Sequence, residues 1–181
     1  MINNIIIFLS GIAFQNIMLC ITAIITVTIY YNQMIEKRKT AYRIIYLQIQ
    51  SIKENSEKIR DCFESKIKFD VDNFWETINI LEFNEWNKYN HYFYHGLTSG
   101  EFQSISNYYN HASSMDGSYR EIRNATLYIF NEFYGKNSNN SNDSTVCNIT
   151  VPGTMSNAII KQYDRLKEME KCLPLEKLKK Y

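Results

Sequence analysis

The residues best spaced for metal binding are His91 and His95, two of the three histidines of the chain. On a helix, side chains four positions apart share a face, so both imidazoles could ligate one ion. A helical hairpin could bring His111 close to these two histidines. Glu101 and Asp116 are the nearby acidic residues that could complete the site. However, His-Tyr-Phe-Tyr-His lacks the glutamate that follows the first histidine of a zinc protease. We therefore expect surface or hydrogen-bonded histidines, with no metal and no other cofactor.

Other patterns of catalysis are missing from the sequence. No glycine-rich phosphate loop precedes a Lys-Ser or Lys-Thr pair, and no serine lies in a nucleophile-elbow motif. The cysteines Cys20, Cys62, Cys147 and Cys172 form no Cys-x-x-Cys motif, so we expect reduced thiols. The 20 Lys plus Arg nearly balance the 19 Asp plus Glu, so we expect no nucleic-acid partner. The sequence does not predict an enzyme.

The strongest feature of the sequence is an uncharged, apolar stretch from Ile5 to Tyr31. At a rise of 1.5 Å per residue, about 20 such residues cross a hydrocarbon core of about 30 Å. Gln15 and Asn16 weaken insertion without cancelling it, because each central Ile, Leu or Phe favours it by roughly 0.3 to 0.6 kcal/mol. The basic start and the small residues of a signal-peptide cleavage site are missing. We expect a retained transmembrane anchor over residues 1–32.

Aromatic and basic residues follow one end of this anchor. The aromatic pair suits a membrane interface and the basic residues suit the cytoplasmic side: Tyr30, Tyr31, Lys37, Arg38, Lys39 and Arg43. This favours a single-pass protein of the cell membrane, with its N-terminus outside and its C-terminal domain in the cytoplasm. Four Asn-x-Ser/Thr sequons within residues 124–150 would favour the opposite topology in a eukaryotic secretory protein. The abundance of Ile, Asn, Lys and Tyr is typical of AT-rich codons and favours a bacterium or a phage.

Four small or polar residues lie close to one face of the predicted membrane helix, namely Gly11, Gln15, Thr22 and Thr26. Membrane helices associate through such faces by close packing and by hydrogen bonds. Two interpretations stay open. The face could mediate self-association, or its Thr and Gln side chains could bond to carbonyls of their own helix.

A long amphipathic helix is predicted over residues 33–69, continuing the anchor. The segment from Gln33 to Lys68 has no Gly or Pro. Its apolar residues recur at intervals of three, four and seven: Ile35, Tyr42, Ile45, Ile49, Ile52, Ile59, Phe63 and Ile67. Such a stripe forms either a parallel coiled coil or the face on which the rest of the domain packs. We favour packing within the chain.

Further helices are predicted downstream, so the fold class is all-α. Capping boxes at Thr98–Glu101 and Ser118–Glu121 indicate two helix starts. We expect a small helical bundle over 70–135, with helices at about 72–95, 98–115 and 118–135; an Asn- and Ser-rich loop over 136–153; and a C-terminal helix with a basic tail over 154–181. The juxtamembrane helix would pack against this bundle.

Several residues between the basic turn and Gly135 carry a family resemblance: Trp86, Tyr92, Gly96-Leu97-Thr98-Ser99-Gly100-Glu101 and Tyr108-Tyr109. In this region the chain resembles a bacterial family of single-pass helical proteins of unknown function. The resemblance implies a membrane-anchored helical domain and no particular activity.

Three classes of function follow from these observations. We predict a membrane-tethered cytoplasmic interaction or scaffolding module, which binds a protein partner or a second copy of itself. The alternative is an oligomeric, pore-type effector of phage or bacterial defence, and the third class is a metal-dependent enzyme. The basic groups at 37–39 and in the C-terminal tail suit contact with a membrane surface.

Overall fold

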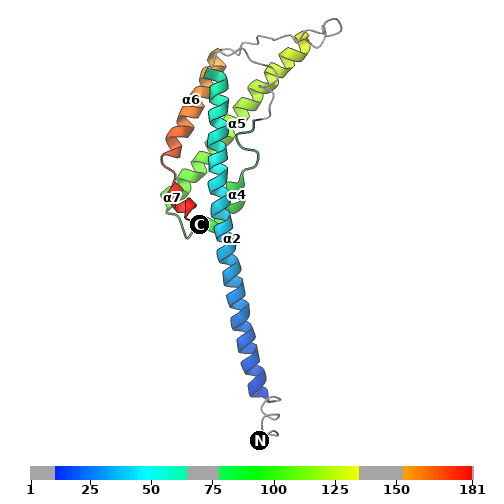
Figure 1. Cartoon of the computed structure of the whole chain (residues 1–181), viewed down its shortest axis with the longest axis vertical. Helices are drawn as coiled ribbons and strands as arrows, with labels where there is room; N and C mark the ends of the chain where they lie inside the picture. Colours follow the sequence, from blue (N-terminus) through cyan, green and yellow to red (C-terminus); the bar gives the residue numbers. More distant parts are fainter. Residues whose placement is uncertain (1–10, 65–77, 135–152, 181) are drawn as a thin grey trace. The chain divides into compact units, whose positions relative to one another are not determined.

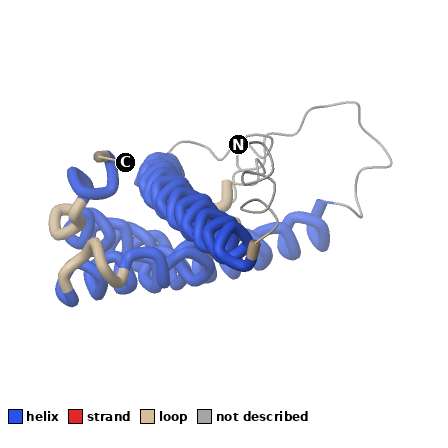
Figure 2. The backbone as a smooth tube through the Cα atoms, turned by 90° about the horizontal axis from the view of Figure 1, so that it is seen from below, coloured by secondary structure: helices blue, strands red, loops and turns tan. Residues whose placement is uncertain are grey.

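The computed structural model describes residues 11–64, 78–134 and 153–180, and these residues form helices and loops without a β-strand (Figures 1 and 2). The helices are α2 (Ile12–Glu64), α4 (Glu85–Tyr89), the 3-10 helix η1 (Asn90–Phe93), α5 (Ser99–Tyr134), α6 (Gly153–Glu170) and α7 (Leu175–Lys179). The all-α prediction is confirmed over this part of the chain. The chain divides into two compact units, Met1–Ala41 and Tyr42–Tyr181.

In the first unit, α2 carries the part of the predicted anchor from Ile12 onward, and residues 1–10 lie outside the described part of the chain. Its large apolar side chains from Ile17 to Tyr31 are exposed. None of the most apolar window of α2 is buried within the chain, whereas the core helix of a soluble domain is mostly buried. By length and composition, α2 is the one described helix that could cross a membrane.

In the second unit, α2 buries the predicted stripe from Tyr42 to Phe63; Ile35 of the first unit is half-buried, and Ile67 lies outside the described residues. Its buried side chains are Tyr42, Ile45, Ile49, Ile52, Ser56, Ile59 and Phe63. The ring of Phe63 meets that of Tyr119 of α5 edge-on, with centroids 6.4 Å apart. Ser56 interrupts the apolar series, but its hydroxyl donates to the Lys53 carbonyl (2.9 Å), so this buried polar group is hydrogen-bonded.

The helix α5 differs from the prediction of two helices. The capping box at its start is confirmed, because Thr98 N–H donates to Glu101 Oε2 (2.8 Å) and Glu101 N–H donates to Thr98 Oγ1 (3.3 Å). The predicted break near residues 115–118 is wrong. The hydroxyl of Ser118 donates to the Ser114 carbonyl (3.1 Å), one turn back along the same helix, instead of capping a new one.

The predicted helix over 72–95 is wrong for residues 78–84, and residues 72–77 lie outside the described part of the chain. Asp116 Oδ1 of α5 accepts the backbone N–H of Ile80 (2.8 Å) and, more weakly, that of Leu81 (3.5 Å). These amides therefore bond to a distant carboxylate instead of a preceding carbonyl. Helix α4 begins only at Glu85, after Asn84, whose side chain accepts from Asn87 N–H (3.2 Å).

The C-terminal helix predicted from residue 154 is confirmed as α6, which packs along α5 and buries Ile159, Tyr163 and Leu166. The one-turn helix α7 follows Pro174 and was not predicted, because five residues are too few for a periodic pattern. It is held in place by Leu178, which is buried. The predicted loop lies almost entirely outside the described residues.

Gly96 lies directly against the side chain of Tyr42. A Cβ atom at position 96 would come within 1.9 Å of Tyr42 Oη and 3.2 Å of its Cζ. The Tyr42 ring is buried and packs on Phe93 at a centroid distance of 4.3 Å, so it has little room to move. Glycine is therefore required at this close approach.

Replacing Gly96 by alanine is expected to lower the free energy of unfolding by about 1–3 kcal/mol, because the added methyl group overpacks a filled site. The measurement is chemical unfolding of the full chain in detergent, followed by circular dichroism. Gly100→Ala is the matched control: no atom outside its helix lies within 4 Å of its Cβ position. Because Gly100 lies in the first turn of α5, its replacement should change the free energy of unfolding by no more than about 0.5 kcal/mol.

A double-mutant cycle tests the stated cause of the Gly96 effect. If Tyr42 Oη is the obstacle, Gly96→Ala should cost less in a Tyr42→Phe background than in the native one. Equal costs in both backgrounds would contradict the steric explanation.

Candidate functional site

A groove of about 430 Å³ lies between α2 and the non-helical segment 78–84, within the second unit. Its α2 wall is formed by Gln48, Ser51, Asn55 and Lys58, which flank the buried stripe of that helix. The other wall is formed by residues 78–80, 82, 83 and 85. The groove exists because residues 78–84 run past α2 without forming a helix.

Side-chain amides of α2 hold this wall in place. Gln48 uses both ends of its amide: Oε1 accepts from Glu85 N–H (3.3 Å), and Nε2 donates to the Phe83 carbonyl. Asn55 Nδ2 donates to the Asn79 carbonyl (2.9 Å). Together with the bond from Ile80 N–H to Asp116, these contacts fix the backbone at several points, so the groove is preformed.

The groove is lined mainly by polar groups and has one exposed aromatic ring at its edge. Phe83 is exposed at its edge, and Leu47 is exposed on the adjoining part of α2. Glu85 Oε2 is buried and pairs with Lys88 Nζ at 3.7 Å. A mainly polar groove with an exposed aromatic ring at its edge suits contact with another polypeptide.

The histidines predicted as weak metal candidates do not form a site. His91 lies in η1 and His95 in the turn after it, so the expected helical face that would bring both imidazoles together is missing. His111 Nε2 lies 3.0 Å from the Gln162 carbonyl of α6. Among the described residues, no group of three or more His, Cys, Asp and Glu side chains could hold a metal ion.

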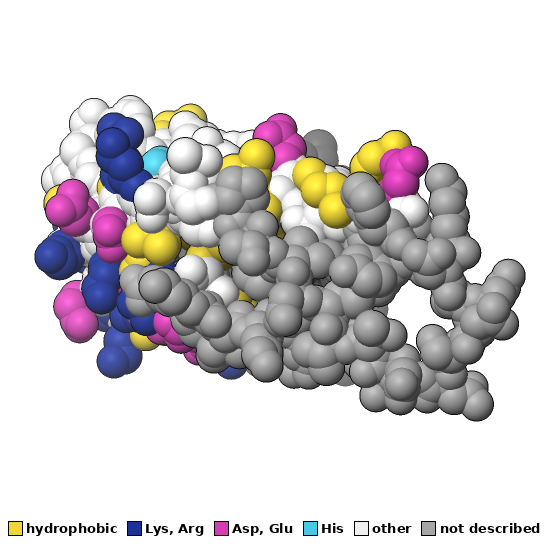
Figure 3. All heavy atoms as spheres, turned by 90° about the horizontal axis from the view of Figure 1, so that it is seen from above, with side chains coloured by type: hydrophobic (Ala, Val, Ile, Leu, Met, Phe, Trp, Pro, Cys, Tyr) yellow, Lys and Arg dark blue, Asp and Glu magenta, His cyan; other side chains and the backbone are white. Residues whose placement is uncertain are grey.

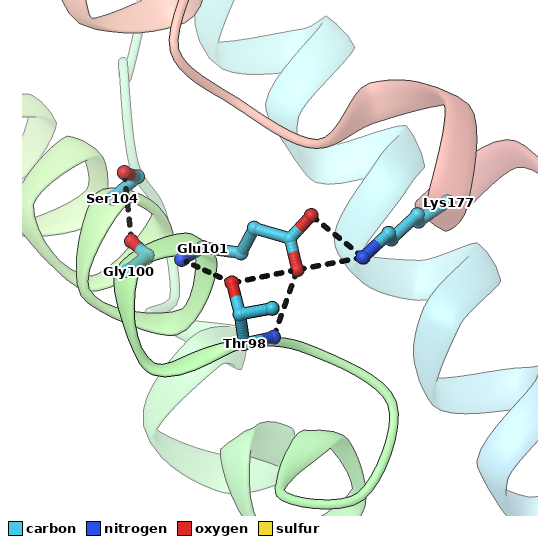
Figure 4. A network of polar contacts seen from close by, with 5 residues as sticks. All are labelled: Thr98, Gly100, Glu101, Ser104 and Lys177. Atoms are coloured by element: carbon cyan, nitrogen blue, oxygen red, sulfur yellow. Dashed lines mark hydrogen bonds and ion pairs between the residues drawn. The ribbon is translucent and has the colours of Figure 1, made fainter.

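Both acidic residues considered as further ligands have structural partners. Asp116 is buried, binds the Ile80 amide and pairs with Arg120 Nε (2.7 Å). Glu101 binds Thr98 and also pairs with Lys177 of α7, whose Nζ lies 2.7 Å from Oε1 and 2.8 Å from Oε2 (Figure 4). The hydrogen bond from Lys177, followed by that from the Thr98 backbone, lowers the pKa of Glu101 to about 2.

Acid is expected to break the contact between Glu101 and its two partners. A carboxyl group whose pKa is about 2 when folded and about 4.5 when free stabilises the fold fully above pH 4.5. This contribution is lost as the pH falls from 4.5 towards 2. The measurement is the hydrogen-exchange rate of the Thr98 N–H, corrected for its intrinsic rate. This amide should lose protection over this pH range. In Glu101→Gln, which cannot titrate, its protection should not follow this titration.

The cysteines among the described residues form no disulfide. Cys20, Cys62 and Cys172 are free, and burial raises the pKa of Cys62. A raised pKa keeps the thiol protonated and unreactive. Cys147 lies outside the described residues.

The predicted membrane-interface residues lie on α2: Tyr30, Tyr31, Lys37, Lys39 and Arg43 are exposed and Arg38 is half-buried. Lys39 pairs with Glu36 one turn earlier (2.9 Å). On the predicted association face, Gly11 is half-buried and Gln15 exposed. The hydroxyls of Thr22 and Thr26 donate to the carbonyls of Met18 and Thr22 (2.8 Å each), which is the local alternative anticipated for these residues.

Sequence reasoning missed the groove because amide side chains build it. Gln48 and Asn55 flank an apolar stripe, where polar residues are ordinary and carry no signal of function. Asp116 carried a signal: it lies on the buried face of α5 beside Met115 and Tyr119, where an unpaired carboxylate would be costly. Such a residue must bind a donor from elsewhere in the chain.

The surface of the second unit carries charges of both signs, and the face shown in Figure 3 has basic and acidic side chains interspersed. Lys53 of α2 and Glu170 of α6 form one such pair (2.9 Å), whose hydrogen bond raises the pKa of Lys53.

Comparison with known protein families, with curated proteins and with solved structures gives no match.

Proposed function

We propose that this chain is a membrane-tethered helical interaction module, with the N-terminal part of α2 as its tether and the groove beside Phe83 as its partner-binding surface. One observation carries the tether: the apolar side chains of α2 from Ile17 to Tyr31 are exposed in the folded chain. Exposed apolar surface costs roughly 25 cal/mol per Å² in water. A contiguous surface of this kind is stable only when lipid or protein covers it.

The basic residues after the tether support a single pass through the cell membrane with the helical unit in the cytoplasm. Lys37 and Arg43 lie beyond Tyr31, on the C-terminal side of the apolar stretch. The positive-inside rule predicts that this side faces the cytoplasm. Two contacts support a small bundle in which α5 and α6 pack on α2: Tyr109 Oη donates to the Ile45 carbonyl (3.4 Å), and Arg60 Nη1 donates to Tyr163 Oη (3.3 Å).

The groove supports a protein as the partner. Its α2 amides are occupied by the chain's own backbone, which leaves the exposed Phe83 ring as the group available for binding. Aromatic anchors surrounded by polar groups are typical of protein interfaces.

Site-specific photo-crosslinking in native membranes tests this proposal. A benzophenone side chain replaces Phe83 in one variant of the full chain and Tyr128 of α5 in the other. The two native side chains are equally exposed, at 66% and 68%, and Tyr128 lies outside the groove. A partner of defined mass captured from position 83 and not from 128 is the expected result. Equal capture at both positions, or none at position 83, would contradict the groove as the binding surface.

The second candidate is an oligomeric, pore-type membrane effector, and it depends on the exposed Gln15 in the apolar stretch. A glutamine amide facing lipid gains from bonding to a second helix. This function predicts that overexpression is toxic and that a Gln15→Leu, Thr22→Leu variant is not. In the photo-crosslinking experiment, it predicts products with multiples of the chain's own mass.

A further inference from the structure

The turn after η1 lies at the end of the second unit where the chain enters it. Tyr42 is the first residue of this unit. Its ring packs on Phe93 of η1, and Gly96 approaches its hydroxyl so closely that no side chain fits between them. The turn formed by residues 94–98 is therefore placed beside Tyr42.

Helix α7 is held at the same end. Thr98, which closes the turn, caps α5 together with Glu101, and both oxygens of Glu101 bind Lys177 of α7 (Figure 4). Buried Leu178 anchors α7 in the core. This chain of contacts joins Tyr42, the turn and α7 into one surface, which we call the entry face.

The exposed groups of the entry face are those that suit a lipid headgroup layer. Lys179 and Lys180 are exposed, while Lys177 is neutralised by Glu101 and the one exposed acid of α7 is Glu176. Tyr94 is also exposed and stacks on Phe102, with centroids 5.2 Å apart and planes 16° apart. Lysines attract anionic lipids, and tyrosines favour the membrane interface.

We propose that the entry face docks on the anionic lipid leaflet into which the chain is tethered. This inference rests on the proposed tether. Tyr42 is eleven residues after Tyr31, so even a fully extended connection would keep the entry face within about 40 Å of the interface. Such a short connection gives the headgroups a high effective concentration at Lys179 and Lys180. Docking in turn restricts the directions in which the helical unit can present its groove.

The test uses the full chain reconstituted in vesicles, with a polarity-sensitive fluorophore on Cys172. This thiol is exposed and lies between α6 and α7. Cys20, Cys62 and Cys147 are replaced by serine or alanine so that only Cys172 is labelled. Quenching by a nitroxide carried on the lipid headgroup is then compared between neutral phosphatidylcholine vesicles and vesicles containing phosphatidylserine.

We expect stronger quenching in the anionic vesicles and its loss at high salt. Lys179→Gln with Lys180→Gln should lower the ratio of docked to undocked protein about fivefold for each lysine, hence about 25-fold. The matched control is Lys161→Gln with Arg165→Gln, the same charge change at exposed positions of α6, which should leave quenching unchanged.

Equal quenching in neutral and anionic vesicles would overturn the docking, as would equal effects of the two double variants. An alkaline carbonate wash separates this result from a failure of the tether. A chain that stays with the vesicles but shows no dependence on lipid charge contradicts docking alone. A chain that the wash removes contradicts both docking and the proposed function.

Discussion

Arginine at both Ile21 and Ile25 is expected to abolish retention of the chain in membranes. Each arginine near the centre of a membrane helix costs roughly 2.5–3.5 kcal/mol, and each lost isoleucine forfeits about 0.3–0.6 kcal/mol. The combined penalty of about 6–8 kcal/mol exceeds what the rest of the stretch offsets, since Gln15 and Asn16 already weaken it. The measurement is the fraction of chain that stays with membranes after alkaline carbonate extraction.

The matched control makes the same change in the second unit. Ile21 and Ile25 are 44% and 53% exposed, and Ile129 of α5 and Leu47 of α2 are 45% and 55% exposed. Arginine at Leu47 and Ile129 should therefore leave membrane retention unchanged. Retention of the Ile21→Arg, Ile25→Arg variant would show that the apolar stretch is not the tether.

The parts of the fold that were predictable from the sequence depend on local patterns. The stripe from Tyr42 to Phe63 repeats over several turns of α2, and the Thr98–Glu101 capping box joins groups three residues apart. Each pattern involves residues of a single helix or its cap, and both occur in the structure. The break proposed before Ser118 also followed a local rule, but a serine hydroxyl can bond to a carbonyl of its own helix, and Gly117 meets no obstacle there.

The parts that were not predictable depend on contacts between distant residues. Residues 78–84 have apolar spacing suited to a helix, yet Asp116, 36 positions after Ile80, takes the amide hydrogen that a helix would use. The predicted helix was therefore wrong over these residues. The prediction that His91 and His95 share a helical face depended on the same helix and was wrong as well. The groove is invisible in the sequence for the same reason, because its second wall exists only where that helix is interrupted.

Trp86→Ala is expected to lower the free energy of unfolding by about 3–5 kcal/mol, the largest loss from a single substitution in the second unit. Trp86 is buried, and its ring lies 4.8 Å from that of Phe102, 5.3 Å from that of Phe93 and 6.2 Å from that of Tyr109. Its Nε1 donates to Ser106 Oγ (2.9 Å). The substitution leaves a cavity among these rings and an unused hydroxyl acceptor. The measurement is urea unfolding of the full chain in detergent.

Two further variants separate the role of Trp86 from a general loss of aromatic surface. Tyr128→Ala removes an exposed ring and should change stability by no more than about 0.5 kcal/mol. Trp86→Phe keeps a ring but loses the bond to Ser106, so its cost should lie between those of the other two. Because Trp86 joins α4 to α5 directly after the groove wall ends at Glu85, its loss should also weaken partner capture at position 83. Unchanged capture in a Trp86→Ala variant of reduced stability would show that the side chains of Gln48, Asn55 and Asp116 position the wall without Trp86.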